Sequence, residues 1–101
     1  MKLTKNEIIS VQSALETISE NKNAMVAGIN FREPLRSQLI NSSLKKLEKF
    51  DDLSDYSPKE LTIMSFAVQY ILNISEFFPI SKSEEGLLFS AQTKLLDETE
   101  N

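Results

Sequence analysis

The sequence has neither cysteine nor histidine among its 101 residues. Without cysteine there is no disulfide framework, no thiolate nucleophile and no cysteine-ligated zinc. Without histidine there is no imidazole base, no Ser-His triad and no metal-binding imidazole. These two absences exclude most familiar catalytic constellations. We therefore predict that the chain is not an enzyme and that it holds no cofactor or metal.

The remaining residues offer no clear alternative site. The acidic cluster Asp51, Asp52 and Asp55 lacks the ligand spacing of an EF-hand loop, which needs Gly at its sixth position and Glu at its twelfth. The two glycines, Gly28 and Gly86, stand alone and cannot form a phosphate-binding loop. No small-molecule substrate is evident from these patterns.

Long apolar runs are also missing. The most apolar stretch, residues 63–74, is interrupted by Ser65, Gln69 and Asn73. It is shorter than the ~20 apolar residues that a membrane-spanning helix needs. The first nine residues contain three charged side chains, so they do not resemble a secretory leader. We predict a soluble cytoplasmic protein without a membrane partner.

Charge is distributed unevenly along the chain. Residues 1–50 carry eight Lys and Arg against five Glu, whereas residues 51–101 carry three Lys against ten Asp and Glu. One interpretation is that the two halves fold against each other through exposed ion pairs, each worth about 0 to 1 kcal/mol. The other is a dipolar surface that orients a partner or a second copy of the chain.

Apolar residues recur at spacings of three and four, and only two Gly and three Pro interrupt them, which predicts helices throughout. Thr4 with Glu7 and Ser57 with Glu60 have the spacing of capping boxes, and residues 30–33 form a further cap pattern before Pro34. Gly28 is placed to end the first helix in a left-handed turn. We predict one all-α domain over residues 1–101, a small antiparallel four-helix bundle with helices near 5–27, 31–49, 58–77 and 83–98.

The third predicted helix has an unusually wide apolar surface. Its polar residues fall within an arc of roughly 80°, which leaves an apolar arc of roughly 280°. We therefore expect this helix to be central in the bundle or shared between two molecules. The polar residues of this arc are Thr62, Ser65, Gln69, Asn73 and Glu76.

Aromatic residues follow one edge of the same helix. Phe66, Tyr70 and Phe77 have spacings of four and seven, and large aromatic side chains on a helix edge are typical anchors of protein interfaces. We predict that they form a candidate interface. The alternative is that the other three helices simply cover them.

Arg36 lies in the middle of the apolar arc of the second predicted helix, which is unusual for arginine. It could hold a partner's carboxylate or another anion in bidentate geometry, so we include it in the candidate interface. Alternatively, it reaches water at a bundle end or pairs with Asp51, Asp52 or Asp55 of its own chain.

The second helix also invites a nucleic-acid hypothesis, because phosphate binding needs clustered Lys and Arg. Its basic residues, however, spread around the predicted helix, and Pro34 would fall inside the recognition helix of a helix-turn-helix. A nucleic-acid partner is therefore unlikely. The basic residues considered are Arg32, Arg36, Lys45, Lys46 and Lys49.

Together these observations favour a non-enzymatic protein–protein interaction module that binds a protein partner, or itself, through the third helix. A small accessory, inhibitor or immunity-type protein fits this description, and the high Lys, Ile, Asn and Ser usage is typical of an AT-rich bacterial or phage sequence. One alternative is a structural homodimer. A less favoured one is a nucleic-acid accessory protein that uses the second helix.

Overall fold

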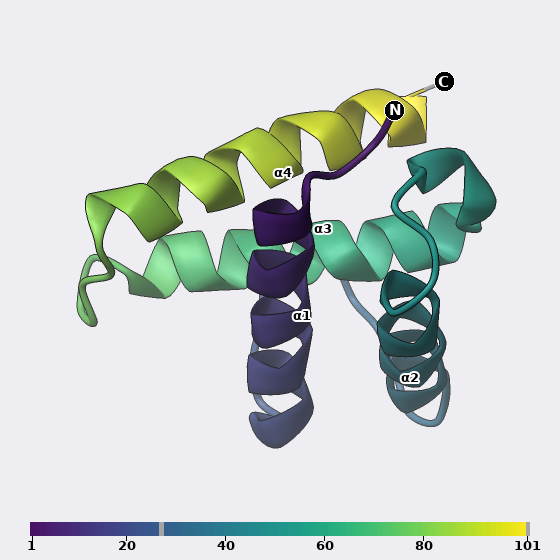
Figure 1. Ribbon diagram of the computed structural model, residues 1–101. Coiled ribbons are helices and arrows are strands. Elements are labelled where there is room, and N and C mark those ends of the chain that lie inside the picture. The colour runs from purple at the N-terminus through teal and green to yellow at the C-terminus, as the bar shows by residue number, and fades with distance from the viewer. Residues whose placement is uncertain (27, 101) are drawn as a thin grey trace.

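The computed structural model, which describes residues 1–26 and 28–100, confirms an all-α fold with four helices (Figure 1). A single 3₁₀ turn, η1, lies before the third helix at Leu53–Asp55. The four helices are α1 (Lys5–Glu20), α2 (Leu35–Leu47), α3 (Pro58–Ile74) and α4 (Lys82–Glu100).

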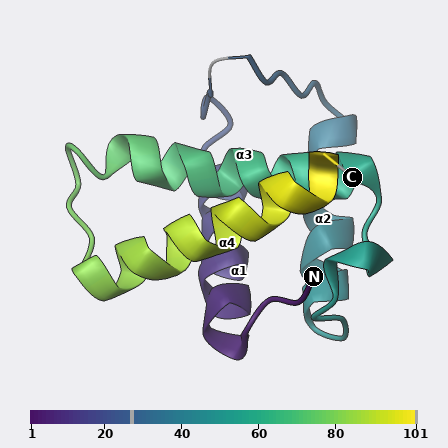
Figure 2. The ribbon, with the colours of Figure 1, turned by 90° about the horizontal axis from the view of Figure 1, so that it is seen from above.

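The helices form two layers that cross steeply. α3 and α4 run side by side in opposite directions, and α1 and α2 lie across them (Figures 1 and 2). α3 contacts each of the other three helices, as expected for a central helix with a wide apolar arc. Within the part of the chain described here, no helix is long and apolar enough to cross a membrane.

Both predicted capping boxes are confirmed, and they start α1 and α3. The Thr4 hydroxyl accepts a hydrogen bond from the Glu7 amide, and the Glu7 carboxylate accepts one from the Thr4 amide. Ser57 and Glu60 repeat this exchange at α3, where Pro58 occupies the first helical position. Each box satisfies two backbone donors that a helix start would otherwise leave without partners.

The predicted end of the first helix is wrong. α1 stops at Glu20, and the Asn21 side chain then accepts a hydrogen bond from the Asn23 amide, a local turn that competes with the helix. Gly28 does have the left-handed conformation expected of it, with φ +83°, but it lies in the loop after α1. The predicted last helical residue, 27, lies outside the described residues.

The other boundaries shift by smaller amounts. α2 begins at Leu35 rather than near residue 31, and its cap residue, Pro34, makes no side-chain hydrogen bond to the helix. α3 ends at Ile74 instead of residue 77. Just after this end, the Ser75 hydroxyl donates a hydrogen bond to the Leu72 carbonyl oxygen. α4 starts one residue earlier and extends two residues further than predicted.

The core is built around the first three turns of α3, where every residue from Ile63 to Val68 is buried. Apolar residues of α1 pack against them, with Val11, Leu15 and Ile18 fully buried. The apolar residues that α2 and α4 add are Leu39, Ile40, Leu47, Leu88, Ala91 and Leu95.

The polar arc of α3 does not simply face solvent. α4 covers part of it, and Ser65 donates a hydrogen bond to the side chain of Gln92, which donates in turn to Gln69. Ser65 and Gln92 are both buried. In its first three turns α3 is thus covered by the rest of the chain on its apolar arc and on part of its polar arc, as expected for a central helix.

One buried hydroxyl group gives a stability prediction. Ser43 on α2 is fully buried, and its Oγ is the one buried side-chain polar atom of the described residues without a hydrogen-bond partner. We expect Ser43→Ala to raise the free energy of unfolding by about 0.5 to 1 kcal/mol, because alanine needs no partner and favours helix. Urea denaturation measures this change.

Ser42→Ala is the matched control, because it brings the same gain in helix propensity on the same helix. The Ser42 hydroxyl already donates to the Leu39 carbonyl oxygen. If Ser43→Ala is no more stabilising than Ser42→Ala, the buried hydroxyl carries no cost of its own.

Candidate interaction surface

The structure separates the three aromatic residues of the predicted interface. Phe66 is only 2% exposed, and its ring packs edge-to-face against Phe31 with 6.0 Å between ring centroids. Phe31 comes from the loop between α1 and α2, which the sequence pattern assigned to a helix. Phe66 is therefore a core residue of this chain and not part of an exposed face.

Tyr70 has an intermediate position. Its ring is half-buried against the core, and its hydroxyl accepts a hydrogen bond of 2.7 Å from the side-chain amide of Asn21. This bond joins the second half of α3 to the residue that ends α1. The Tyr70 hydroxyl is therefore engaged within the chain.

Phe77 is exposed, but it no longer belongs to a helix. It lies in the turn between α3 and α4, with 77% of its surface exposed, and the neighbouring Phe78 is 72% exposed. The predicted spacing placed Phe77 on the same face as Phe66, but that relation required α3 to continue for three more residues.

A groove of about 460 Å³ lies beside this turn, between the turn and α1. Exposed Ile9 of α1 and exposed Phe78 line it, together with the half-buried side chains of the α3 end. We call this surface the α3–α4 corner and define it as Ile9, Ile71, Ile74, Phe77, Phe78 and Ile80.

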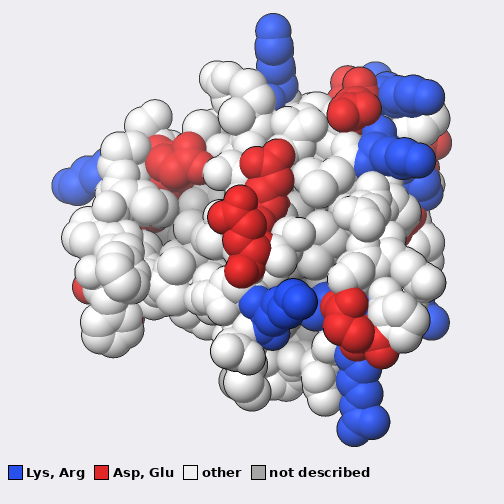
Figure 3. Space-filling view, turned by 90° about the horizontal axis from the view of Figure 1, so that it is seen from below, with Lys and Arg blue, Asp and Glu red and all other residues white. Residues whose placement is uncertain are grey.

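The α3–α4 corner carries little charge. Among the described residues that line the groove, Glu84 is the one that carries a charge, and the α1 wall adds serine and threonine hydroxyls. In the space-filling view of Figure 3 the left flank, which is the side of the α3–α4 turn in Figure 1, has a continuous uncharged area with basic and acidic side chains at its margin. Exposed aromatic side chains next to a shallow apolar groove are typical of an interaction site.

Arg36 is buried, contrary to its assignment to an exposed interface. It is 6% exposed, and its Nη2 donates to the carbonyl oxygens of Ile18 at 2.8 Å and Asn21 at 3.1 Å. The alternative pairing with Asp51, Asp52 or Asp55 is also wrong, because Arg36 lies in the first turn of α2 and those residues follow its other end. The guanidinium instead meets the negative end of the α1 dipole.

The basic residues of α2 do not form one surface. Arg36 is buried against α1, and Lys46 makes an ion pair with Glu60. On the face that Figure 3 shows, positive and negative side chains are interspersed. Two of the five cations considered for phosphate binding are thus engaged within the chain.

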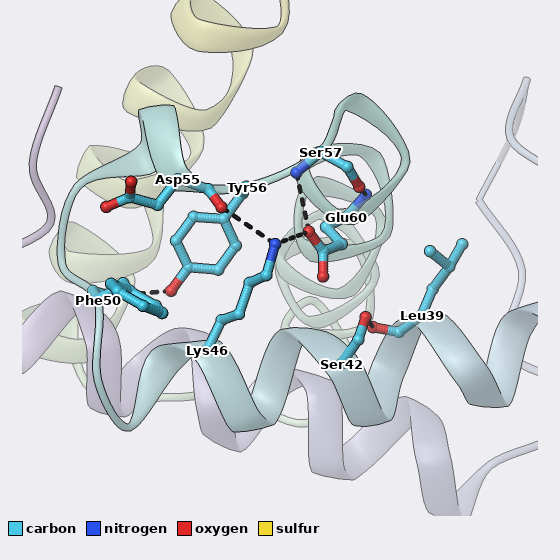
Figure 4. A network of polar contacts seen from close by, with 8 residues as sticks. All are labelled: Leu39, Ser42, Lys46, Phe50, Asp55, Tyr56, Ser57 and Glu60. Atoms are coloured by element: carbon cyan, nitrogen blue, oxygen red, sulfur yellow. Dashed lines mark hydrogen bonds and ion pairs between the residues drawn. The ribbon is translucent and has the colours of Figure 1, made fainter.

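Two glutamates of the capping boxes are buried and have a second role. Glu60 is 4% exposed, and its Oε1 accepts hydrogen bonds from Lys46 Nζ at 2.7 Å and from the Ser57 amide at 2.8 Å (Figure 4). Lys46 Nζ also donates to the Asp55 carbonyl oxygen and lies over the Tyr56 ring. This network joins α2 to the start of α3.

Glu7 has the same arrangement at the start of α1. It is 2% exposed, its Oε1 lies 2.7 Å from Lys94 Nζ, and its Oε2 accepts a hydrogen bond from the Ser90 hydroxyl. Both partners come from α4, more than eighty residues further along the chain. In each capping box the glutamate thus also forms an ion pair with a lysine of a second helix.

These contacts change the acidity of both carboxyls. Burial alone would raise their pKa values, but the hydrogen bonds from Lys94 and Ser90 lower the pKa of Glu7 to about 2. The bonds from Lys46 and Ser57 likewise lower the pKa of Glu60 to about 2. Both groups are therefore ionised near neutral pH, a state that suits an ion pair better than general acid catalysis.

Sequence reasoning assigned Glu7 and Glu60 only to helix caps, because neither lysine partner is near in sequence. It also missed Phe78 and Ile9 as surface residues. A usable signal was present in Phe77, Phe78 and Pro79, since two adjacent bulky aromatics before a proline point to an apolar turn.

Comparisons with protein-family models, with curated proteins and with solved structures find no match to this chain.

Proposed function

We propose that the chain is a non-enzymatic, cytoplasmic protein–protein interaction module, and that the α3–α4 corner is its binding surface. The observation that carries the proposal is the pair Phe77 and Phe78, which are 77% and 72% exposed beside an apolar groove. Exposing two adjacent phenylalanines to water costs free energy that a partner would recover by covering them.

The groove suits an amphipathic helix of a partner protein. A volume of about 460 Å³ accommodates one or two large apolar side chains rather than a whole helix. Helix-in-groove recognition uses such anchors from one helix face. Because Glu84 is the charged residue of the lining, the matching partner helix carries a Lys or Arg beside its apolar anchors.

A double substitution tests this proposal. We expect Phe77→Glu with Phe78→Glu to reduce capture of the partner by about tenfold or more, since two carboxylates replace the apolar anchors. Quantitative mass spectrometry of crosslinked, nuclease-treated captures, compared between wild type and variant, measures the effect. Both side chains are largely exposed, so the thermal stability should change little.

Phe89→Glu is the matched control, because Phe89 on α4 is 55% exposed and lies outside the groove lining. If both variants capture the same proteins as wild type, the α3–α4 corner is not the binding surface. Light scattering over a concentration series tests the alternative, that the partner is a second copy of the chain. In that case the wild type would dimerise, whereas the double variant at Phe77 and Phe78 would stay monomeric.

A further inference from the structure

A second pocket, of about 640 Å³, lies on the loop between α1 and α2, at a different place from the α3–α4 corner. Two cationic residues line it, Lys22 and Arg36, and no Asp or Glu is among the described residues of its lining. The pocket therefore has the electrostatic character of an anion site.

Arg36 is the central feature of this pocket. It is only 6% exposed, and no carboxylate of the described residues lies within ion-pair distance of it. Its Nη2 is used by two backbone carbonyls, while the guanidinium has further N–H groups on Nε and Nη1. The two carbonyl oxygens at the negative end of α1 offset part of the cost of burying this cation, and a bound anion would offset more of it.

The rest of the lining is mostly apolar. Phe31 and Phe66 meet edge-to-face in its wall, and Val26 and Ile29 add aliphatic surface. A volume of about 640 Å³ falls within the range of small-molecule sites, which combine apolar walls with a few polar groups that orient the ligand. The walls thus favour a ligand with an apolar body next to its negative group.

We propose that this pocket binds a small carboxylic acid with an apolar body, through Arg36 and Lys22. The carboxylate accepts hydrogen bonds from the guanidinium of Arg36 and meets the ammonium of Lys22, and the apolar body packs on Phe31 and Phe66. This site is independent of the proposed protein-binding surface, because the two pockets have no described lining residue in common.

The first test compares an acid with its uncharged analogue on the full chain. We expect 3-phenylpropanoate to shift the NMR signals of the residues 22–31 amides and of Arg36 Nε–H, and to bind at least about tenfold tighter than 3-phenylpropanamide. Equal binding of the acid and the amide would overturn the proposal, since it would indicate an apolar pocket without anion recognition. Absence of shifts at these residues would also overturn it.

Two variants then test the residues. Arg36→Gln should abolish the preference for the acid, but this change could also unfold the end of α1. Lys22→Glu avoids that problem, because Lys22 is exposed, and it should weaken acid binding by about fivefold while leaving amide binding unchanged. The control is Lys5→Glu, an exposed lysine of α1 outside the pocket. If Lys22→Glu and Lys5→Glu weaken binding equally, only the overall charge matters and the site assignment fails.

Discussion

Replacing Lys94 with methionine should lower the free energy of unfolding by about 3 kcal/mol. Methionine keeps most of the apolar stem but removes the ammonium, which leaves the Glu7 carboxylate buried at 2% exposure without its cationic partner. Leaving one charge of a buried pair alone costs more than the pair itself contributes. Urea denaturation at about pH 7, followed by far-UV circular dichroism, measures the loss.

The matched control is Lys82→Met, because Lys82 is exposed at the other end of α4 and has no ion pair within the described chain. It should change stability by no more than about 0.5 kcal/mol. Adding Glu7→Gln to Lys94→Met should recover part of the loss, since the buried charge is then gone. If the two lysine variants behave alike, the pair between α4 and Glu7 does not hold the helices together.

The starts of α1 and α3 could be predicted from the sequence because the signals are local. A capping box needs only four consecutive residues, and Thr4 with Glu7 and Ser57 with Glu60 supply them without help from the rest of the chain. The end of α1 combines a local contact with a distant one. α1 stops where Asn21 turns toward its own loop and hydrogen-bonds to Tyr70, which lies 49 positions away in sequence.

The candidate site could likewise be predicted only in part from the sequence. Phe66, Tyr70 and Phe77 form one edge only if the helix continues through all three, and α3 ends at Ile74. Phe66 then remains in the core, while Phe77 passes into an exposed turn. Periodicity therefore identified aromatic residues of interest, but the helix boundary decided which of them reach the surface.

Arg36 illustrates the limit for charged residues. Its place in an apolar arc marked it as unusual, but the prediction that it belongs to an interface was wrong, because the pattern could not show which group it meets. The acceptors are backbone carbonyl oxygens at the end of α1. Every residue has a backbone carbonyl, so the residue types could not identify these two. The same holds for Glu7 and Glu60, whose lysine partners are found only once the helices have been packed.

Acid should unfold this protein between about pH 4.5 and pH 2. Both Glu7 and Glu60 have pKa values lowered from 4.5 to about 2 in the folded chain. Because the pKa is lower in the folded chain, each ionised carboxylate stabilises the fold fully when the pH is above 4.5, the pKa in the unfolded chain. This stabilisation is lost as the pH falls toward 2, the pKa in the folded chain. Each group accounts for about 3 kcal/mol, so the two together approach the total stability of about 5 to 15 kcal/mol of a small domain.

Urea denaturation at constant ionic strength over this pH range measures the slope, and the double variant Glu7→Gln with Glu60→Gln shows which groups cause it. The double variant should be less stable than wild type near pH 7 but should lose much less of its stability on acidification, because its two amides do not titrate. Equal slopes for wild type and variant would contradict the assignment to these carboxyls. Acid unfolding would then come from the general repulsion among the positive charges of the chain.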